Sequence, residues 1–582
     1  RIGRNLVPRL RSPRLADHAA GLYALAARET AEIEADEDSI WLSLIVPVYN
    51  APRRYLNDLL KSVRMQGIAG VELILSDDAS SDPQTRKWLA AAQECMADVT
   101  LVLNRENGGI AAALNAGLAQ ARGEWIGFLD HDDLVAPHAL KLIRKALDAH
   151  PDAAFLYTDE LVVDDRLRPK GYMLKPAYDP ILLTGVNYIN HLSVFRRSRL
   201  ERIGFLRAGY DGSQDYDLLL RYLRGVPDEA VLHLPYPAYW WRRNGKTYSR
   251  RFIDKATANA RRALSDHMRV RGVDAEIGPA LTATLHRIAF TERPVPPRVS
   301  IVIPNKNAYR LVKRVLQDLF ERTDYPDFEV LVIDNGSDDR AVLDLYEHYR
   351  GRCRNFSADV RSEPFNFARA VNRGLSQASG EHFLLLNNDI EVIHPDWLTE
   401  MVSCLNYDRA GIVGAKLLYP NGTLQHAGVI AGFGGLAGHW YLDKPGTYAG
   451  PMNRLHVRAS MTCVTGAAML IAGECRRAVG DFDATNFAVA YNDVDYCLRA
   501  HKQGFRIVWT PFASLYHHES ASRGSEKSVG NRVRFEAEKA NLRRIHATAD
   551  FADPAASPLN GRSHSTPKLK RIDRLPPART WR

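Results

Sequence analysis

The sequence Ser43-Leu-Ile-Val-Pro-Val-Tyr-Asn50 returns 257 residues later as Ser300-Ile-Val-Ile-Pro-Asn-Lys-Asn307. At the same offset, Asn115-Ala-Gly-Leu-Ala-Gln-Ala-Arg-Gly-Glu124 stands against Asn372-Arg-Gly-Leu-Ser-Gln-Ala-Ser-Gly-Glu381. The match runs without a gap over roughly ninety residues, and its period is far too long for a solenoid. The chain therefore contains two copies of one large domain.

Each copy alternates predicted strands with predicted helices. In the first copy, short apolar runs rich in β-branched residues predict strands at 42–48, 71–75, 100–103 and 124–129, with helices between them. This alternation predicts an α/β fold in which a mostly parallel sheet is joined by helical crossovers. Ligands of such sheets bind beyond the carboxyl ends of the strands, and the polar loops of both copies fall there.

The same patterns divide the chain into five segments. We expect a helical N-terminal extension over 1–40, a first domain over 41–290, a Pro-rich linker over 291–298 and a second domain over 299–530. Residues 531–582 are expected to form a helical and basic tail. We predict that this tail is partly disordered, because its end is rich in Ser, Pro and basic residues.

The composition is that of a soluble globular protein, with 46% hydrophobic and 25% charged residues. No run approaches the ~18 apolar residues that a membrane-spanning helix needs. The six cysteines include no CxxC pair, which argues against a disulfide framework or a zinc site and fits a reducing, cytoplasmic location.

The net charge of +9 is concentrated in part at the two ends of the chain. Solvated tails explain this pattern, and weak attraction to the anionic inner face of the cell membrane is the functional alternative. We do not expect nucleic acid as a partner, because no basic stretch is interleaved with aromatic residues. The basic residues concerned are Arg1, Arg4, Arg9, Arg11, Arg14, Lys568, Lys570, Arg571, Arg574, Arg579 and Arg582.

An acidic loop follows the fourth predicted strand of each copy. The first copy reads Asp130-His-Asp132-Asp133, and the second reads Asn387-Asn388-Asp389. Carboxylates in this arrangement can share a hard divalent cation. The second copy retains an acid only at the position of Asp132, so Asp132 and Asp389 are the expected metal ligands. A solvated acidic turn is the alternative.

A second pair of acidic positions closes the second strand of each copy, at Asp77-Asp78 and Asp334-Asn335. A carboxylate there can accept hydrogen bonds from a base or a ribose. An Asx-turn or a helix cap accounts for the same residues, and the pattern taken alone favours that alternative.

Two later acids introduce amphipathic helices. Asp215 lies in Gly212-Ser-Gln-Asp-Tyr-Asp217, and Asp493 lies in Tyr491-Asn-Asp-Val-Asp495. An N-cap with favourable charge near the helix dipole explains such acids. We expect the second Asp of each pair to line the first helical turn. The first Asp would project into the cleft, where it could act as general base on a sugar hydroxyl.

In their joint order, found twice, these motifs resemble the inverting family 2 glycosyltransferases of GT-A fold. The first half carries Val-Pro-Val-Tyr-Asn, Ser-Asp-Asp-Ala-Ser-Ser-Asp and Gln-Asp-Tyr-Asp. The second half, with Asn-Asp-Val-Asp-Tyr-Cys-Leu-Arg and Tyr-His-His-Glu-Ser, is similar to the rhamnosyl- and galactofuranosyl-transferase-like members. The resemblance covers about 41–250 and 299–525.

The resemblance implies a UDP-, dTDP- or GDP-linked sugar donor, Mg²⁺ or Mn²⁺ on Asp132 and Asp389, and Asp215 and Asp493 as the catalytic bases. It also implies a late histidine ligand, for which His517 and His518 are candidates in the second half. The first half reads Tyr239-Trp-Trp-Arg242 where many relatives show His-Trp-Arg, so its late ligand is expected to be missing. The expected donor-binding positions are Pro47, Tyr49, Asp77, Asp78, Asn115, Asp130, Pro304, Asp334, Asn335, Asn372 and Asn388.

These features predict a tandem, bifunctional glycosyltransferase that extends a bacterial surface polysaccharide such as O-antigen or capsule. Its acceptor would be an oligosaccharide or a lipid-linked glycan. The alternative is one catalytic half beside a non-catalytic sugar- or nucleotide-binding half. Trp240 indicates that the first half would be the non-catalytic one. A nucleotidyltransferase is disfavoured, because neither copy has a Gly-rich phosphate loop. The Gly-rich run 427–438, between His426 and His439, would form an acceptor loop or a structural excursion.

Overall fold

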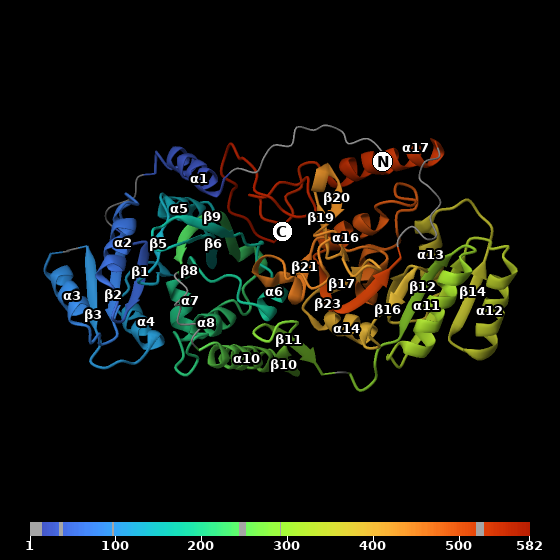
Figure 1. Cartoon of the computed structure of the whole chain (residues 1–582), viewed down its shortest axis with the longest axis horizontal. Coiled ribbons are helices and arrows are strands. Elements are labelled where there is room, and N and C mark those ends of the chain that lie inside the picture. Colours follow the sequence, from blue (N-terminus) through green and yellow to red (C-terminus); the bar gives the residue numbers. More distant parts are fainter. Residues whose placement is uncertain are drawn as a thin grey trace.

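The computed structural model describes residues 14–33, 39–95, 98–243, 252–291, 293–518 and 529–581. Two α/β domains lie side by side along the longest axis of the molecule (Figure 1). Among the described helices, none is long and apolar enough to cross a membrane.

The first domain is built on a nine-stranded mixed sheet of order β3-β2-β1-β4-β8-β6-β9-β5, with β7 paired to β6. Its first four strands are parallel, as expected, and the antiparallel β8 joins them to the rest of the sheet. β1 is buried at every residue, because helices cover both faces of the sheet. The strands are β1 Leu42–Val48, β2 Val71–Asp77, β3 Val99–Leu103, β4 Trp125–Phe128, β5 Leu134–Val135, β6 Phe155–Val163, β7 Pro169–Met173, β8 Ser193–Arg196 and β9 Val231–Arg242.

The helices of the first half lie between these strands, and α1 precedes them. α1 is not a detached appendage, because its Leu22 and Ala26 belong to the core of the first domain. After α10, a two-stranded hairpin leads into the linker. The helices are α1 Leu15–Glu29, α2 Arg53–Arg64, α3 Pro83–Cys95, α4 Ile110–Leu118, α5 Ala139–Asp148, α6 Pro180–Gly185, α7 Arg197–Ile203, α8 Gln214–Tyr222 and α10 Ile253–Val270, and the hairpin strands are β10 Ala275–Pro279 and β11 His286–Phe290.

The second domain repeats this topology strand for strand, in the order β14-β13-β12-β15-β22-β17-β23-β16. The predicted duplication is thus visible in the sheet pairing as well as in the sequence. The strands are β12 Val299–Asn305, β13 Phe328–Asp334, β14 Phe356–Val360, β15 His382–Leu386, β16 Ile390–Val392, β17 Ala410–Leu418, β22 Ala468–Ile471 and β23 Arg506–His517. The helices are α11 Tyr309–Arg322, α12 Arg340–Arg352, α13 Phe367–Gln377, α14 Trp397–Ser403, α15 Gly473–Val479, α16 Asn492–Lys502 and α17 Val529–His546.

The extra length of the second domain lies between β17 and β22. It contains β18 Leu424–His426, β19 Val429–Ala431, β20 Ala437–His439 and β21 Ala459–Met461. β19 and β20 form a separate antiparallel hairpin from the Gly-rich run, while β18 and β21 extend the main sheet. The Gly-rich run is therefore an ordered hairpin packed on the domain.

A glycine in the Asn-x-Gly motif of each copy lets a helix press against the central strand. A Cβ on Gly117 would overlap Ile45, and one on Gly374 would overlap Val302. We expect Gly117→Ala and Gly374→Ala each to lower the free energy of unfolding by about 1–3 kcal/mol, through overpacking. In the control Gly21→Ala, on α1, the added methyl meets nothing within 4 Å, and we expect a gain of about 0.5–1 kcal/mol. Equilibrium denaturation measures all three, and equal effects would contradict the packing argument.

The C-terminal tail is folded onto the rest of the protein. Ala555, Leu559 and Trp581 are buried in the cores of the two domains. The Arg579 guanidinium donates to the backbone oxygens of Asp553, Ala556 and Lys175. The expected disorder is therefore wrong over the described part of the tail. The Ser- and Pro-rich tail also contains a few apolar residues, and these become buried only when the tail packs against the folded domains.

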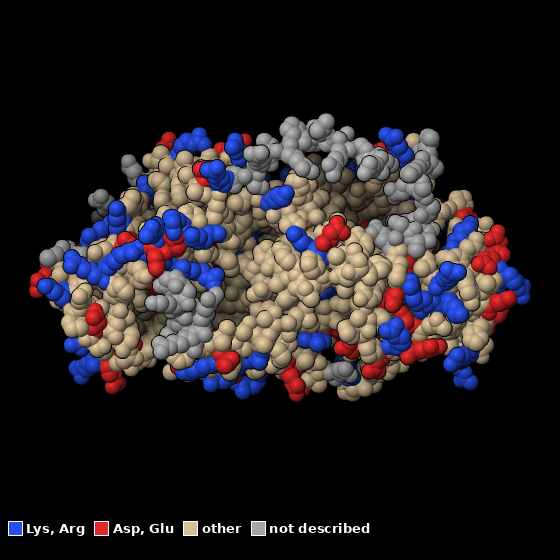
Figure 2. Space-filling model, viewed as in Figure 1, with Lys and Arg blue, Asp and Glu red and all other residues tan. Residues whose placement is uncertain are grey.

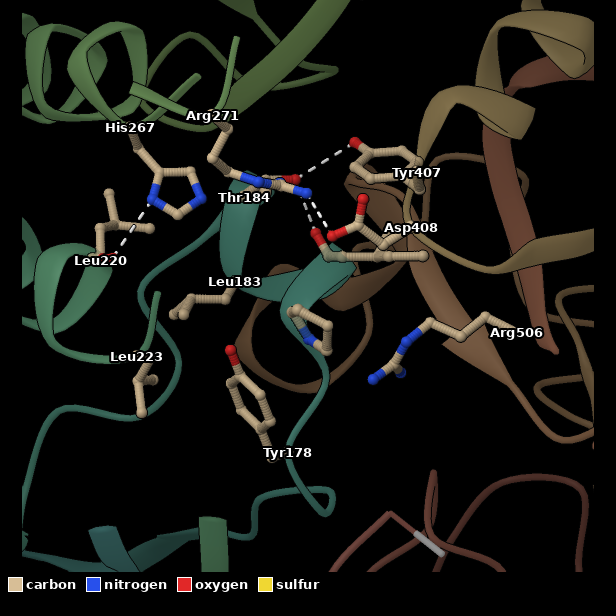
Figure 3. A pocket seen from close by; sticks show the side chains of 12 residues that line it. Tyr178, Leu183, Thr184, Leu220, Leu223, His267, Arg271, Tyr407, Asp408 and Arg506 are labelled. Carbon is tan, nitrogen blue, oxygen red and sulfur yellow. Dashed lines mark hydrogen bonds and ion pairs between the residues drawn. The ribbon is translucent and has the colours of Figure 1, made fainter. Parts of the chain in front are cut away.

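The two domains share a buried, polar interface. Asp179, at the N-cap of α6, accepts from the backbone N–H and the hydroxyl of Ser460 in β21, both at 2.7 Å. A small cavity lies where α6 and α10 face the second domain, and Thr184 and Tyr407 are hydrogen-bonded across it at 3.2 Å (Figure 3). The Pro-rich linker therefore joins two halves that are packed together.

Candidate active sites

The acids that close the second strand of each sheet are held by local hydrogen bonds. Asp77 accepts from the N–H and hydroxyl of Ser80, and Asp334 accepts from those of Ser337. Asp78 accepts from the N–H groups of Gly108 and Gly109 at 2.9 Å. The contacts of Asp77 and Asp334 agree with the Asx-turn alternative, whereas those of Asp78 join two separate loops. A donor contact at these positions stays a prediction.

The other expected donor-binding positions surround the same strand ends. Pro47 is buried and its carbonyl faces the His131 ring at 3.2 Å, whereas Tyr49 is exposed. In the second domain, buried Asn388 donates to Asn305, which in turn donates to Asp334. Pro304 and Asn335 are partly exposed at that edge.

The asparagines of the repeated Asn-x-Gly motif have a structural role. Asn115 bonds both the carbonyl and the N–H of Leu206, and Asn372 bonds those of Phe482 in the same way. Each side chain thereby fixes the loop that precedes the candidate base. These contacts give Asn115 and Asn372 a structural role, and their expected contact with the donor stays a prediction.

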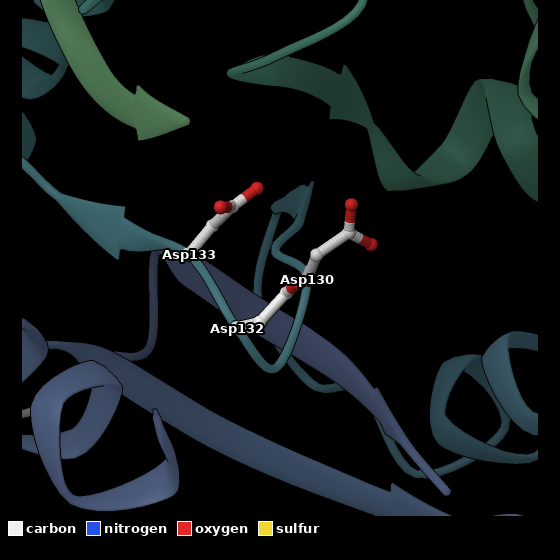
Figure 4. A group of neighbouring side chains, drawn as sticks. All are labelled: Asp130, Asp132 and Asp133. Carbon is white, nitrogen blue, oxygen red and sulfur yellow. The ribbon is translucent and has the colours of Figure 1, made fainter. Parts of the chain in front are cut away.

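Three carboxylates converge in the loop between β4 and β5 of the first domain. Asp130, Asp132 and Asp133 each offer an oxygen within 4.8 Å of the others, as Figure 4 illustrates. Desolvation and then the charge of Asp130 raise the pKa of Asp132. This local excess of negative charge, on oxygen ligands, suits a hard divalent cation.

Asp133 is the structural member of this cluster. Its carboxylate accepts from the Tyr239 hydroxyl at 2.6 Å and from the Arg242 N–H at 2.7 Å. It is 1% exposed, and burial followed by the neighbouring acids raises its pKa well above the usual range. Asp130 and Asp132 keep the more accessible carboxylates.

The second domain pairs its single acid with a histidine. His517 Nε2, at the end of β23, lies 3.1 Å from Asp389 Oδ1. His518 instead lies 2.8 Å from Glu391, which also faces Arg314. Adjacent residues of an extended chain point to opposite sides, so the two imidazoles face different acids. Of the two candidates, His517 is the one placed against Asp389.

The Gly-rich hairpin brings further imidazoles to this region. His426 is fully buried and its Nδ1 lies 3.1 Å from Nδ1 of His439. Burial, then the nearby His439 and His517, hold the pKa of His426 well below its ordinary value. His426, at the end of β18, and His439, at the end of β20, therefore lie near the second candidate site.

The candidate bases Asp215 and Asp493 begin α8 and α16. Asn187 donates to Asp215 at 3.1 Å, and the N–H of Gly466 donates to Asp493 at 2.8 Å. Desolvation raises the pKa of Asp215, and the nearby His191 opposes this shift.

The second Asp of each pair is structural, as expected. Asp217 pairs with Arg221 and Asp495 with Arg499, and both acids are 1% exposed.

The structure brings one unpredicted residue to the first site and gives another residue a structural role. His191, just before β8, places Nε2 3.6 Å from Asp130 Oδ2, although no motif marked it in the sequence. Trp240, which pointed to the first half as the non-catalytic one, donates its indole N–H to Tyr23 of α1 at 2.7 Å and packs on that ring. Trp240 therefore serves to attach α1 to the domain.

The profile of glycosyl transferase family 2 matches residues 43–204 and 300–447, one segment in each domain. The chain therefore belongs to glycosyl transferase family 2, and the tandem α/β GT-A architecture expected from the sequence is confirmed.

Two relatives align along most of the chain. An uncharacterised protein, y4gI, from Sinorhizobium fredii is 39% identical over 92% of this chain and 59% of the relative. The O-antigen biosynthesis protein RfbC of Myxococcus xanthus is 37% identical over 88% of this chain and 40% of the relative. The chain thus spans about half the length of these two proteins.

Solved structures of similar fold include S. aureus TarS 1-349 in complex with UDP, with a TM-score of 0.31 and 21% identity over 39% of this chain and 65% of that chain. Another is the mannosyltransferase PcManGT of Pyrobaculum calidifontis in complex with GDP-Man and Mn²⁺. Its TM-score is 0.31, with 16% identity over 45% of this chain and 79% of that chain.

Proposed function

We propose that the chain is a bifunctional, metal-dependent, inverting glycosyltransferase with one active site in each domain. Its donors would be nucleotide sugars, and its acceptor an oligosaccharide or lipid-linked glycan of a bacterial surface polysaccharide such as O-antigen. The observation that carries this proposal is the recurrence, on two sheets of matching strand order, of an acidic loop after the fourth strand and of an aspartate at the start of a later helix. The kinship with an O-antigen biosynthesis protein supports the acceptor class.

The residues of both sites fit a divalent cation. In the first domain Asp130 and Asp132 would hold it. In the second domain Asp389 and His517 would hold it, since Asp389 Oδ1 and His517 Nε2 are 3.1 Å apart. A bound cation would stabilise the negative charge that develops on the leaving nucleoside diphosphate.

The two helix-start aspartates would act as bases on the acceptor. Asp215 and Asp493 would each take the proton of an acceptor hydroxyl, whose oxygen then attacks the anomeric carbon from the face opposite the leaving group. The hydrogen bonds from Asn187 and from the Gly466 N–H would orient the two carboxylates. One displacement of this kind inverts the anomeric configuration.

A peripheral position at the inner face of the cell membrane would suit a lipid-linked acceptor, and the basic ends of the chain support it. Arg579 does not suit that role, because its guanidinium is hydrogen-bonded to the backbone oxygens of Asp553 and Ala556. Arg1, Arg4, Arg9, Arg11 and Arg582 lie outside the described residues. Lys and Arg are mixed with Asp and Glu over the face shown in Figure 2. Sedimentation with anionic vesicles at low salt tests this position. A protein that did not sediment with the vesicles would contradict it.

The test of the proposed function is donor binding and hydrolysis across UDP-, dTDP- and GDP-linked sugars, with Mg²⁺ or Mn²⁺. Wild type is compared with Asp132→Ala and Asp389→Ala. We expect each variant to lose a different, separable part of the activity, and EDTA to remove all of it. If Asp389→Ala abolished everything and Asp132→Ala nothing, the first domain would be a binding module.

A further inference from the structure

The two domains differ in the strand that supplies a histidine to the acidic loop. β16 pairs with β23 so that Ile390 lies opposite His517, and β5 pairs with β9 so that Leu134 lies opposite Trp240. Ile390 is the copy of Asp133, the residue before Leu134. The first domain therefore has Trp241 at the position of His517.

The opposite difference is found just before β8 and its copy β22, where the first domain has a histidine and the second does not. β4 pairs Ile126 with Phe195, and the copy β15 pairs Phe383, which corresponds to Ile126, with Ile471. Counting back four residues from each partner places His191 of the first domain at the position of Ala467 of the second. The two copies therefore carry their histidine at different positions. The first domain has it where the second has Ala467, and the second domain has it where the first has Trp241.

The His191 ring is held in place from several sides. It stacks on Tyr239 with ring centroids 4.5 Å apart and an interplanar angle of 15°, and the hydroxyl of that tyrosine donates to Asp133. The backbone N–H of His191 donates to Glu160 at 3.2 Å, and its carbonyl accepts from Lys175 at 2.6 Å. Glu160 and Lys175 form a fully buried ion pair, so the segment has a fixed support.

The spacing between the ring and the acid is close to that of two ligands of one ion. His191 Nε2 lies 3.6 Å from Asp130 Oδ2. Donor atoms about 2.1 Å from a shared ion lie roughly 3.0–3.4 Å apart at octahedral to tetrahedral angles, so only a small approach of the two side chains would bring both onto one ion. In the second domain His517 lies 3.1 Å from Asp389, the copy of Asp132.

We propose that His191 Nε2 is the imidazole ligand of a divalent cation in the first domain, completing the site formed by Asp130 and Asp132. This inference rests on the proposed function in one respect, that a cation binds to this loop. It replaces the expectation that the first domain lacks its late ligand. Each site then combines acidic oxygens with one imidazole, which comes from the segment before β8 in the first domain and from the end of β23 in the second.

The test is Mn²⁺ titration, followed by the EPR signal of free Mn²⁺, in a chain whose second site is removed by Asp389→Ala. We expect one bound Mn²⁺ in this background. His191→Ala and His191→Gln should each weaken its binding at least ~10-fold, given the size of such effects even for outer-shell partners of a metal. Glutamine keeps a polar side chain of similar size, and the unfolding temperature without metal checks that both variants fold. His150→Ala, at a distant helix end, is the control and should leave the affinity unchanged.

Two outcomes separate the inference from the function beneath it. If the His191 variants bind Mn²⁺ as tightly as their background while Asp132→Ala does not, His191 is not a ligand and the proposed site stands. If the Asp389→Ala background itself binds no Mn²⁺, the proposed metal dependence of the first domain fails, and the inference fails with it.

Discussion

Asp493→Asn should abolish one glycosidic linkage of the product, and Asp215→Asn the other. An amide cannot take the proton of the acceptor hydroxyl, and general-base catalysis contributes typically ~10²–10⁴-fold. We therefore expect the rate of the affected transfer to fall by about that factor, with donor binding retained. The amide can still accept the hydrogen bonds that hold the carboxylate, from Asn187 in one domain and from Gly466 in the other. Linkage analysis of the products, with single-turnover rates for each donor, measures both effects.

Asp217→Asn is the matched control, because this acid lies two residues beyond Asp215 and pairs with Arg207 and Arg221. It should lower stability without selectively removing a linkage. If Asp215→Asn changed only affinity or chain length, the first domain would be a binding module. If neither base variant slowed transfer, the assignment of both aspartates would be wrong.

Glu400→Gln should produce the largest loss of stability among single substitutions at the domain interface. Glu400, in α14, is 2% exposed and is bonded by Arg458 through two nitrogens and by Arg287 of β11. Arg458 also donates to the carbonyl of Ile288, so the network fastens the end of the first half to the second domain. Removing one partner of a buried ion pair costs about 3–5 kcal/mol, since it leaves charge unpaired.

The pH dependence of this loss follows from the same contacts. Burial would raise the pKa of Glu400, but Arg458 and Arg287 outweigh it and hold the pKa at about 2. A carboxyl whose pKa is lower in the folded state stabilises the protein above its unfolded pKa, about 4.3, and loses that contribution as the pH falls toward about 2.

Denaturant unfolding should therefore show the full difference between wild type and Glu400→Gln at pH 7, and a shrinking difference below about pH 4.3. Glu474→Gln, an exposed acid in α15, should stay within ~0.5 kcal/mol of wild type. A pH-independent difference would show that lost packing, and not charge, underlies the effect.

The sequence alone determined the duplication, the fold class and the positions of both candidate bases. These features are local or periodic. Apolar runs such as 42–48 predict buried strands, and a gap-free repeat requires two copies of the same sheet. The second Asp of each Asp-x-Asp pair was also predictable, because a helix N-terminus favours an acid at that place.

Only the tertiary structure decided which side chains meet across the sheets. His517 and His518 are adjacent in sequence, and the pairing of β23 with β16 turns only the first toward Asp389. His191 reaches Asp130 because β8 lies beside β4, a contact between segments that no local pattern connects. For the same reason Trp240 is bonded to Tyr23 of α1, and Arg579 of the tail is bonded to the carbonyl of Lys175 in the first domain. Such contacts depend on which strands are neighbours in the sheet, and the propensity and hydrophobic period of one segment do not encode that order.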